Sequence, residues 1–218
     1  MISPFLVLKL GAFLLAGLLF AELKGVAWVR LAFKAPLSAL FVLTALLQPG
    51  AGSTFGLLMI AGLLLCLVGD LCLALAGEGS FKLGLASFLA GHLVYLAAFS
   101  WLEPPLSWLT WRTLVVAGVS GAAFLWLRPH LGRLKLPVLA YVAAIGLMVS
   151  AAWALFAAPT LSPRGPTLIF LGAVLFYLSD LFVARDRFVS PGWINRFLGL
   201  PLYYAGQFLL AFSIGLID

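Results

Sequence analysis

The sequence predicts an all-α fold, a polytopic transmembrane helical bundle of about eight spans. Hydrophobic residues make up 64% of the chain and charged residues only 9%, whereas a soluble domain carries about a quarter charged residues. The hydrophobic stretches mostly reach about 18 residues, the length a helix needs to cross a hydrocarbon core of about 30 Å. Backbone groups in lipid need internal partners and alternating strand patterns are absent, so helices are favoured over a β-barrel.

The hydrophobic stretches divide the chain into eight expected spans, with short connectors marked by Pro, Gly and charge. The first stretch has no positive charge before it and no clear cleavage site, so it is expected to be a retained span. No connector is long enough for a soluble domain, and we expect residues 1–218 to form a single transmembrane domain. The spans are expected at roughly 4–21, 31–47, 55–76, 82–101, 107–127, 134–157, 166–184 and 198–216.

Lys and Arg are distributed unequally between the two sides of the predicted bundle. Three of the 13 basic residues, Lys9, Arg112 and Arg164, fall on the side of the termini. Cytoplasmic connectors carry an excess of Lys and Arg, so both termini are expected to be non-cytoplasmic. The ten on the other side are Lys24, Arg30, Lys34, Lys82, Arg128, Arg133, Lys135, Arg185, Arg187 and Arg196.

The net charge of +6 does not point to nucleic acid, because the basic residues lie singly or in pairs between hydrophobic segments. Cys66 and Cys72 are six residues apart in one hydrophobic segment, a spacing that fits neither a metal pair nor a redox motif. We therefore expect no metal and no cofactor.

Two acidic residues lie inside predicted spans, Asp70 in the third and Asp180 in the seventh. An Asp near a helix centre costs roughly 2.5–3.5 kcal/mol on insertion scales, so such residues usually face the bundle interior and mark function. An interhelical hydrogen bond or a buried ion pair with Lys34 is the structural alternative. The other acids, Glu22, Glu78, Glu103, Asp186 and Asp218, fall at span ends or in connectors.

Further polar residues are expected near the same depth, in the cytoplasmic half of the bundle. At 1.5 Å per residue, most of them fall within one layer, while His92 and Tyr95 reach deeper. Helical spacing puts Gly62, Cys66, Gly69 and Asp70 on one side of the third span. A structural His92 and an interfacial aromatic pair at Tyr203–Tyr204 remain open alternatives. The layer comprises Lys34, Asp70, Tyr141, Asp180, Tyr203, Tyr204 and Gln207.

With these residues in place, the chain resembles the YhhN family of membrane proteins, whose characterised animal members are lysoplasmalogenases. The matching stretches run through nearly the whole chain in order. They are Lys34 with Pro36, "LVGDLCLAL" around Asp70, "FKLGLASFLAGHLVYLAAF" with His92 and Tyr95, "PVLAYVAAIGLM" with Tyr141, "GAVLFYLSDLFVARDRF" with Ser179 and Asp180, and "LPLYYAGQFLLAFS" with Tyr203, Tyr204 and Gln207.

The resemblance implies a hydrolase that cleaves the vinyl ether bond of a lysoplasmalogen, a lysophospholipid, to a fatty aldehyde and a glycerophospho-alcohol. Such a reaction passes through an oxocarbenium ion, as glycoside hydrolysis does between two carboxyl groups. One of Asp70 and Asp180, kept protonated by desolvation and mutual repulsion, would be the general acid, and the other would stabilise the cation and orient water. The sequence does not assign which is which.

The remaining candidates are expected to position those groups or to hold the substrate. They are His92, Tyr95, Tyr141, Ser179, Tyr203, Tyr204 and Gln207 around the carboxyls, and Lys34, Arg185, Arg187 or Arg196 for the substrate phosphate. A proton-coupled transporter or a lipid-binding membrane protein that uses the same carboxylates is the alternative, and a scaffold held by polar interhelical contacts is a third. The Ala- and Leu-rich composition favours a bacterial cytoplasmic membrane. The oligomeric state is left open.

Overall fold

The computed structural model describes residues 4–75, 77–159 and 161–217, so the terminal Asp218 lies outside the described residues. The described chain forms eight α-helices and contains no strand, which confirms the predicted all-α fold. Short 3-10 turns flank α5, and a π-helical turn at Arg185–Val189 follows α7. The helices are α1 (Pro4–Lys24), α2 (Ala27–Leu46), α3 (Thr54–Ala74), α4 (Glu78–Leu102), α5 (Trp111–Leu127), α6 (Lys135–Phe156), α7 (Arg164–Ala184) and α8 (Trp193–Ser213).

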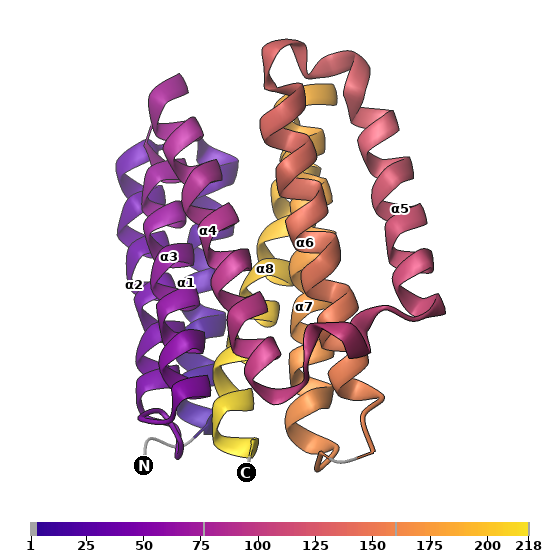
Figure 1. The fold of residues 1–218 in the computed structure, drawn as a ribbon. Coiled ribbons are helices and arrows are strands. Elements are labelled where there is room, and N and C mark those ends of the chain that lie inside the picture. The colour runs from indigo at the N-terminus through magenta and orange to yellow at the C-terminus, as the bar shows by residue number, and fades with distance from the viewer. Residues whose placement is uncertain (1–3, 76, 160, 218) are drawn as a thin grey trace.

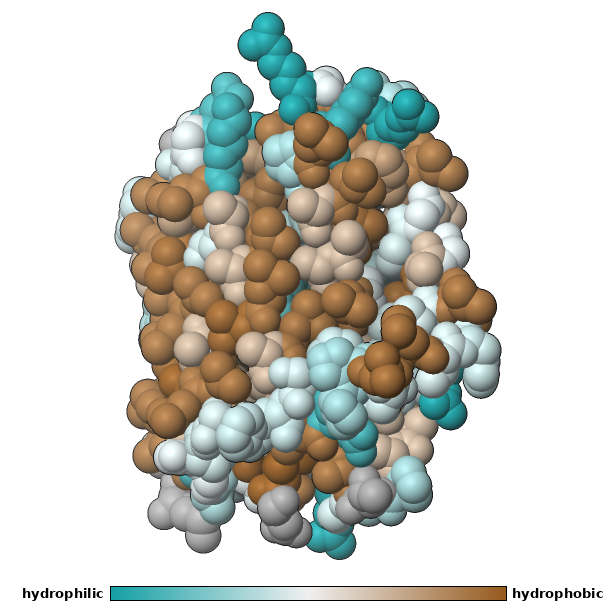
Figure 2. Space-filling model, viewed as in Figure 1, coloured by the Kyte–Doolittle hydropathy of each residue, from teal (hydrophilic) through white to brown (hydrophobic). Residues whose placement is uncertain are grey.

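Seven of these helices are long and apolar enough to cross a membrane. The eighth, α5, has 17 residues, which at 1.5 Å per residue is about 26 Å of helix. Large apolar side chains such as Phe13, Leu64 and Leu114 are exposed on the outer surface. Figure 2 shows hydrophobic side chains over the middle of the face and hydrophilic ones gathered at its upper end. This surface suits lipid, and the protein is an integral membrane protein.

Three helices begin four or five residues earlier than hydropathy predicts. We expected spans from about residues 31, 82 and 198, whereas α2 begins at Ala27, α4 at Glu78 and α8 at Trp193. Gly25, with φ of 67°, allows the chain to leave α1 in a tight turn and to begin α2 two residues later. Helices continue through charged residues until a capping signal ends them, so Arg30 and Arg196 lie on helices and not in connectors.

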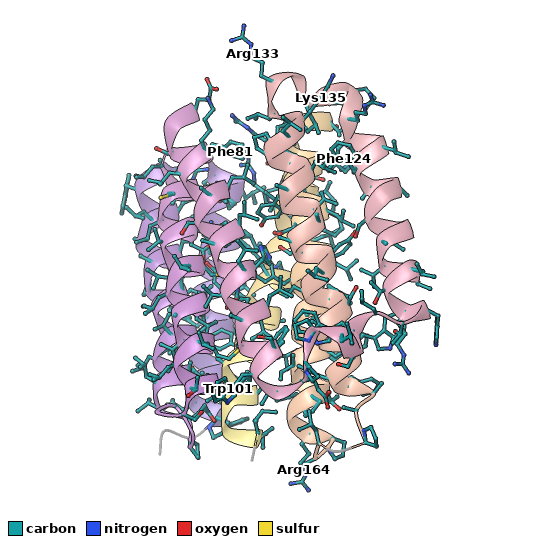
Figure 3. The ribbon with its side chains drawn as sticks, in the orientation of Figure 1. Phe81, Trp101, Phe124, Arg133, Lys135 and Arg164 are labelled. Atoms are coloured by element: carbon teal, nitrogen blue, oxygen red, sulfur yellow. The ribbon has the colours of Figure 1, made fainter. Side chains whose placement is uncertain are left out.

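The helices are arranged around α8. Figure 1 shows α1 to α4 on one side, α6 and α7 on the other, and α5 at the outer edge beside α6. The most extensive packing is between α3 and α4 and between α7 and α8. Both termini lie at one end of the bundle (Figure 1), and Arg133 and Lys135 lie at the opposite end (Figure 3). The side of the membrane that each end faces stays a prediction.

Glycines allow the closest helix contacts, as small residues do in membrane bundles. A Cβ atom built on Gly206 of α8 would lie 2.8 Å from the carbonyl oxygen of Gly172 in α7, and one on Gly172 would lie 2.9 Å from that of Gly206. Gly62 of α3 similarly leaves room for the ring of Tyr95 from α4. The predicted inward face of α3, including Gly62 and Asp70, is buried and therefore confirmed.

Gly206→Ala is expected to lower the free energy of unfolding by roughly 1–3 kcal/mol, because the added methyl group forces α7 and α8 apart. Gly118→Ala on α5 is the matched control, since a Cβ there meets no atom within 4 Å. Thermal unfolding in detergent measures both variants. Equal midpoints for the two variants would contradict close packing at Gly206.

Candidate active site

Asp70 lies at the centre of a buried ionic cluster formed by α2, α3 and α8. Its Oδ1 is 3.1 Å from Nζ of Lys34, an ion pair in which both side chains are almost wholly buried. Its Oδ2 accepts hydrogen bonds from the hydroxyls of Ser38 at 2.7 Å and Tyr203 at 2.6 Å. Both carboxylate oxygens are therefore paired, which is the condition under which a buried charge is tolerated.

The Asp70 cluster extends to a second tyrosine on α8. The hydroxyls of Ser38 and Tyr204 lie 3.1 Å apart. Phe41 of α2 packs against both rings of the tyrosine pair, with centroids 6.4 Å from Tyr203 and 6.3 Å from Tyr204. The pair is therefore buried in the bundle, and it does not lie in an interfacial aromatic belt.

Asp180 of α7 has a different environment at a similar depth. Its Oδ2 accepts one hydrogen bond, at 2.6 Å, from the hydroxyl of Tyr141 in α6. No Lys or Arg of the described residues lies within ion-pair distance of it, and its Oδ1 has no hydrogen-bond partner among them. The side chain is 17% exposed, against 2% for Asp70. Asp180 is thus the less constrained and more accessible carboxyl.

His92 of α4 is fully buried beside Asp180. Its Nε2 is 3.9 Å from Oδ2 of Asp180, too far for a direct hydrogen bond. Its ring lies between Tyr141, at 5.1 Å between centroids, and Phe176, at 4.7 Å. Within the described chain, neither ring nitrogen forms a hydrogen bond to another side chain, and no three His, Cys, Asp or Glu side chains gather as a metal site would require.

Both carboxyls face one cavity of about 430 Å³. Phe176 separates the two clusters, because its ring lies 4.7 Å from that of His92 and 5.3 Å from that of Tyr203. Apart from the three arginines offered for the phosphate, ten candidates were chosen from the sequence, and six of them line this cavity, so the structure brings them together. They are Lys34, Asp70, Tyr141, Ser179, Asp180 and Tyr203.

The other four candidates lie behind the cavity wall. His92 and Tyr204 contact the residues of the wall from outside it. Tyr95 donates a hydrogen bond to Oε1 of Gln207 at 3.0 Å, and Sγ of Cys66 lies 3.8 Å from the same hydroxyl. This third cluster joins α3, α4 and α8 behind the cavity wall.

A network of charges surrounds the mouth of the cavity. Arg196 of α8 pairs with Glu22 of α1 at 3.1 Å and with Asp186 of the π-helical turn at 3.2 Å. Nδ2 of Asn195 donates to Oδ1 of Asp186 at 3.2 Å, and the guanidinium of Arg185 donates to Oδ1 of Asn195. These bonds hold the cytoplasmic ends predicted for α1, α7 and α8 together.

Two cations at this mouth are less engaged. The guanidinium of Arg187 is 4.2 Å from the ring centre of Phe81, and no carboxylate of the described residues is within ion-pair distance. Arg30 is 3.6 Å from Glu22, and its buried Nε has no partner among the described residues. Sequence reasoning counted Arg30 only as a topology charge. Arg30 lies four residues before Lys34 on α2. This helical spacing places the two cations on one face, and it is the sequence signal that could have identified Arg30 as a site residue.

The three other phosphate contacts considered from the sequence already have partners. Lys34 is paired with Asp70, Arg196 with two carboxylates, and Arg185 with Asn195.

Part of the cavity wall is apolar. It comes from α3, α4, α5 and α6. Its residues are Leu73, Phe81, Leu85, Ala123, Leu127, Val138, Val142 and Ile145. The cavity therefore has a cationic mouth, two carboxyls and an apolar wall, which matches the polarity of a single-chain phospholipid.

Fold and site together define a polytopic membrane protein with a buried carboxylate site. The sequence model of the YhhN family matches residues 29–214, and the chain belongs to that family. The resemblance found in the sequence is thereby confirmed.

The relatives of the chain include bacterial and mammalian proteins. "Lysoplasmalogenase TMEM86A" of Bos taurus is 34% identical over 165 residues, which are 70% of this chain and 62% of that protein. "Lysoplasmalogenase" of Mycobacterium tuberculosis is 31% identical over 192 residues, 85% of this chain and 69% of the relative. "Lysoplasmalogenase TMEM86B" of Mus musculus is 33% identical over 199 residues, which are 86% of this chain and 76% of that protein. The chain thus spans less than two thirds of the bovine relative. No solved structure matches the chain.

Asp70→Asn is expected to lower the free energy of unfolding by about 3–5 kcal/mol, because it leaves the buried ammonium group of Lys34 without its partner. The double variant Lys34→Met/Asp70→Asn is expected to recover most of that loss, since neither charge remains. Asp180→Asn, which breaks no ion pair with Lys or Arg, is the matched control and should cost less. Denaturant titration in detergent measures all three, and a double variant no more stable than Asp70→Asn would argue against the pair.

Proposed function

We propose that this protein hydrolyses the vinyl ether bond of lysoplasmalogens within the membrane and releases a fatty aldehyde and a glycerophospho-alcohol. The single observation that carries the proposal is the cavity in which Asp70 and Asp180 lie between a cationic mouth and an apolar wall. Membership of the YhhN family and relatives bearing the name lysoplasmalogenase support it.

The reaction requires a proton donor and a stabilised cation. Protonation of the alkene carbon distal to the ether oxygen gives an oxocarbenium ion, water adds to its carbon, and the hemiacetal collapses to aldehyde and alcohol. The chemistry parallels glycoside hydrolysis, in which one carboxyl group donates a proton while a second, ionised one faces the cation. The cavity supplies two carboxyls in unlike environments, the pattern by which one residue type takes two roles.

Asp180 is the proposed general acid. It has no Lys or Arg partner in the described part of the chain, and Tyr141 holds its Oδ2, which leaves Oδ1 to deliver the proton. After water attacks, the Asp180 carboxylate takes up a proton from that water and is ready for the next cycle. His92, 3.9 Å from the carboxyl, is a positioning residue that limits how Asp180 and Tyr141 move.

Asp70 is the proposed electrostatic partner. Its pairing with Lys34 favours the ionised carboxylate throughout the cycle, so its charge faces the oxocarbenium ion when that ion forms. Tyr203 donates to Asp70 and also lines the cavity, so its oxygen can accept a hydrogen bond from the attacking water. Lys34 is assigned to Asp70 and not to the substrate phosphate.

The substrate phosphate is proposed to bind at Arg187 and Arg30, the two less engaged cations of the mouth. The mouth is proposed to face the cytoplasm, because it lies at the end where Lys and Arg predominate. Both termini would then be non-cytoplasmic, in a bacterial cytoplasmic membrane. Lysophospholipid would enter from that leaflet.

In deuterated water, the released aldehyde is expected to carry one deuterium at the carbon next to the carbonyl, because the acid that protonates the alkene carbon exchanges its proton with the solvent. Asp180→Asn should lower kcat by roughly 10²- to 10⁴-fold, the usual contribution of a general acid, while the protein stays folded. Glu103→Gln is the matched control, since Glu103 follows the C-terminal end of α4 whereas the cavity is lined by the N-terminal half of that helix. Mass spectrometry of the aldehyde gives rate and label together.

Unchanged turnover in Asp180→Asn would refute its role as the acid. No aldehyde from folded wild-type protein, together with pH-driven solute flux in liposomes, would instead favour the transporter alternative.

Arg187→Gln is expected to raise KM for a choline lysoplasmalogen by about tenfold with little change in kcat, because one charge-assisted hydrogen bond is worth about 1.5–3 kcal/mol. A 1-alkenylglycerol, which lacks the phosphate, should show the same KM with both proteins. Steady-state aldehyde release with the two substrates separates phosphate binding from a general loss of structure. An equal effect on both substrates would place the phosphate elsewhere.

A further inference from the structure

A second apolar groove of about 350 Å³ lies between α5 and α6. Three hydroxyls border it, and all three are bonded within the protein. Ser150 donates to the carbonyl of Gly146, Thr113 donates to that of Trp108, and Ser120 bonds to Tyr177. The groove therefore presents hydrocarbon and no free polar group. It is lined by Thr113, Ala117, Ser120, Gly121, Phe124, Leu139, Val142, Ala143, Gly146, Leu147 and Ser150.

The groove and the catalytic cavity share a thin wall. Val142 lines both of them, and the hydroxyl of Ser120 in the groove lies 3.1 Å from that of Tyr177 in the cavity. The wall adjoins the proposed acid, since Val142 follows Tyr141 and Tyr177 lies one turn before Asp180. The reacting centre and the groove are therefore adjacent, with Val142 and the Ser120–Tyr177 hydrogen bond between them.

The outer wall of the groove, α5, is lightly packed. Only Val116, Ser120 and Leu127 of this helix are buried, and it packs mainly on α6. Figure 1 shows α5 standing apart at the edge of the bundle. Its Gly118 and Gly121 face open space, with no atom within 4 Å of an added Cβ. Among the described residues, the bond from Ser120 to Tyr177 is the polar side-chain link between α5 and α7.

We propose that the hydrocarbon chain of the lysolipid substrate passes Val142 and lies in the groove between α5 and α6, so that this groove sets the chain-length preference. Along the substrate, a charged phosphate is followed by the vinyl ether and then by the hydrocarbon chain. The site has charged residues at its mouth, then Asp180, and then the apolar groove. From Gly121 to Thr113 the groove follows α5 for about 12 Å. This inference rests on the proposed function for the identity of the bond that is cleaved. The position of the hydrocarbon chain is inferred from the groove itself.

Kinetics with a series of chain lengths test the proposal. Gly121→Leu adds a side chain to the groove without a clash at Cβ, and Gly118→Leu adds the same side chain to a surface of α5 outside it. Gly121→Leu is expected to lower kcat/KM for an octadecenyl substrate by about tenfold and to leave an octenyl substrate unchanged, because buried methylenes lose their contacts. Gly118→Leu should alter neither. An equal effect of Gly121→Leu on both chain lengths, or no effect, overturns the proposal.

A binding experiment separates this inference from the proposed reaction. A saturated 1-O-alkyl lysophosphocholine with a diazirine at the chain end has no vinyl ether and is photolysed with the protein in nanodiscs. Label is expected on residues 113–124 and 139–150, decreased by Gly121→Leu and by competing lysoplasmalogen.

The outcomes are distinguishable. Label in the groove with no aldehyde from any chain length would keep the groove and refute the reaction. Aldehyde release with label elsewhere in the protein would support the reaction and refute the groove as the site of the chain. Label in the groove that lysoplasmalogen does not displace would assign it to bilayer lipid and overturn the inference.

Discussion

The buried ion pair between Lys34 and Asp70 constrains the rest of the bundle. Both groups lie away from water and 3.1 Å apart, and a charge in that setting is tolerated only with its partner and its hydrogen bonds in place. Ser38 and Tyr203 complete the set. Because the four residues come from α2, α3 and α8, the pair fixes the rotation and height of three helices that hydrophobic packing alone, in lipid, would leave less defined.

The same constraint makes the two carboxyls unlike. Both oxygens of Asp70 are paired with residues of α2 and α8, and these bonds hold the helices together. Asp180 accepts one hydrogen bond, from Tyr141, and lines the cavity. Phe176 lies between the clusters, and the two carboxyls share no hydrogen-bond partner among the described residues, so a change of protonation at Asp180 breaks no bond of the ion pair that holds α2 and α3. Asp70 thereby stabilises the helix packing, while Asp180 is the carboxyl proposed to transfer the proton.

The sequence predicted the helices and the polar layer because length, hydropathy and the cost of a charge in lipid act locally. It also offered Lys34 as an ion-pair partner of Asp70, and the structure confirms that pair. It could not assign Ser38 and Tyr203 to Asp70, because helix rotation brings them there and a hydroxyl in a helix costs too little in lipid to stand out in a sequence. Arg30 was overlooked since hydropathy ends a span at the first charge, whereas the helix begins at Ala27. The two carboxyls themselves were identifiable, but their inequality depends on contacts between distant segments.

A lipid substrate imposes one more requirement, since its hydrocarbon chain needs apolar space beyond the two carboxyls. In this bundle the ionic cluster, the Asp180 pair and the Tyr95–Gln207 bond draw on α2, α3, α4, α6, α7 and α8, and α5 contributes to none of them. Its polar side-chain link to α7 is a neutral hydrogen bond between Ser120 and Tyr177, worth roughly 0.5–1.5 kcal/mol, and its packing contacts, such as that of Leu127 in the cluster with Val138, are apolar. Because α5 takes no part in the charged core, the groove beside it can hold a hydrocarbon chain without breaking any bond of the two carboxyls.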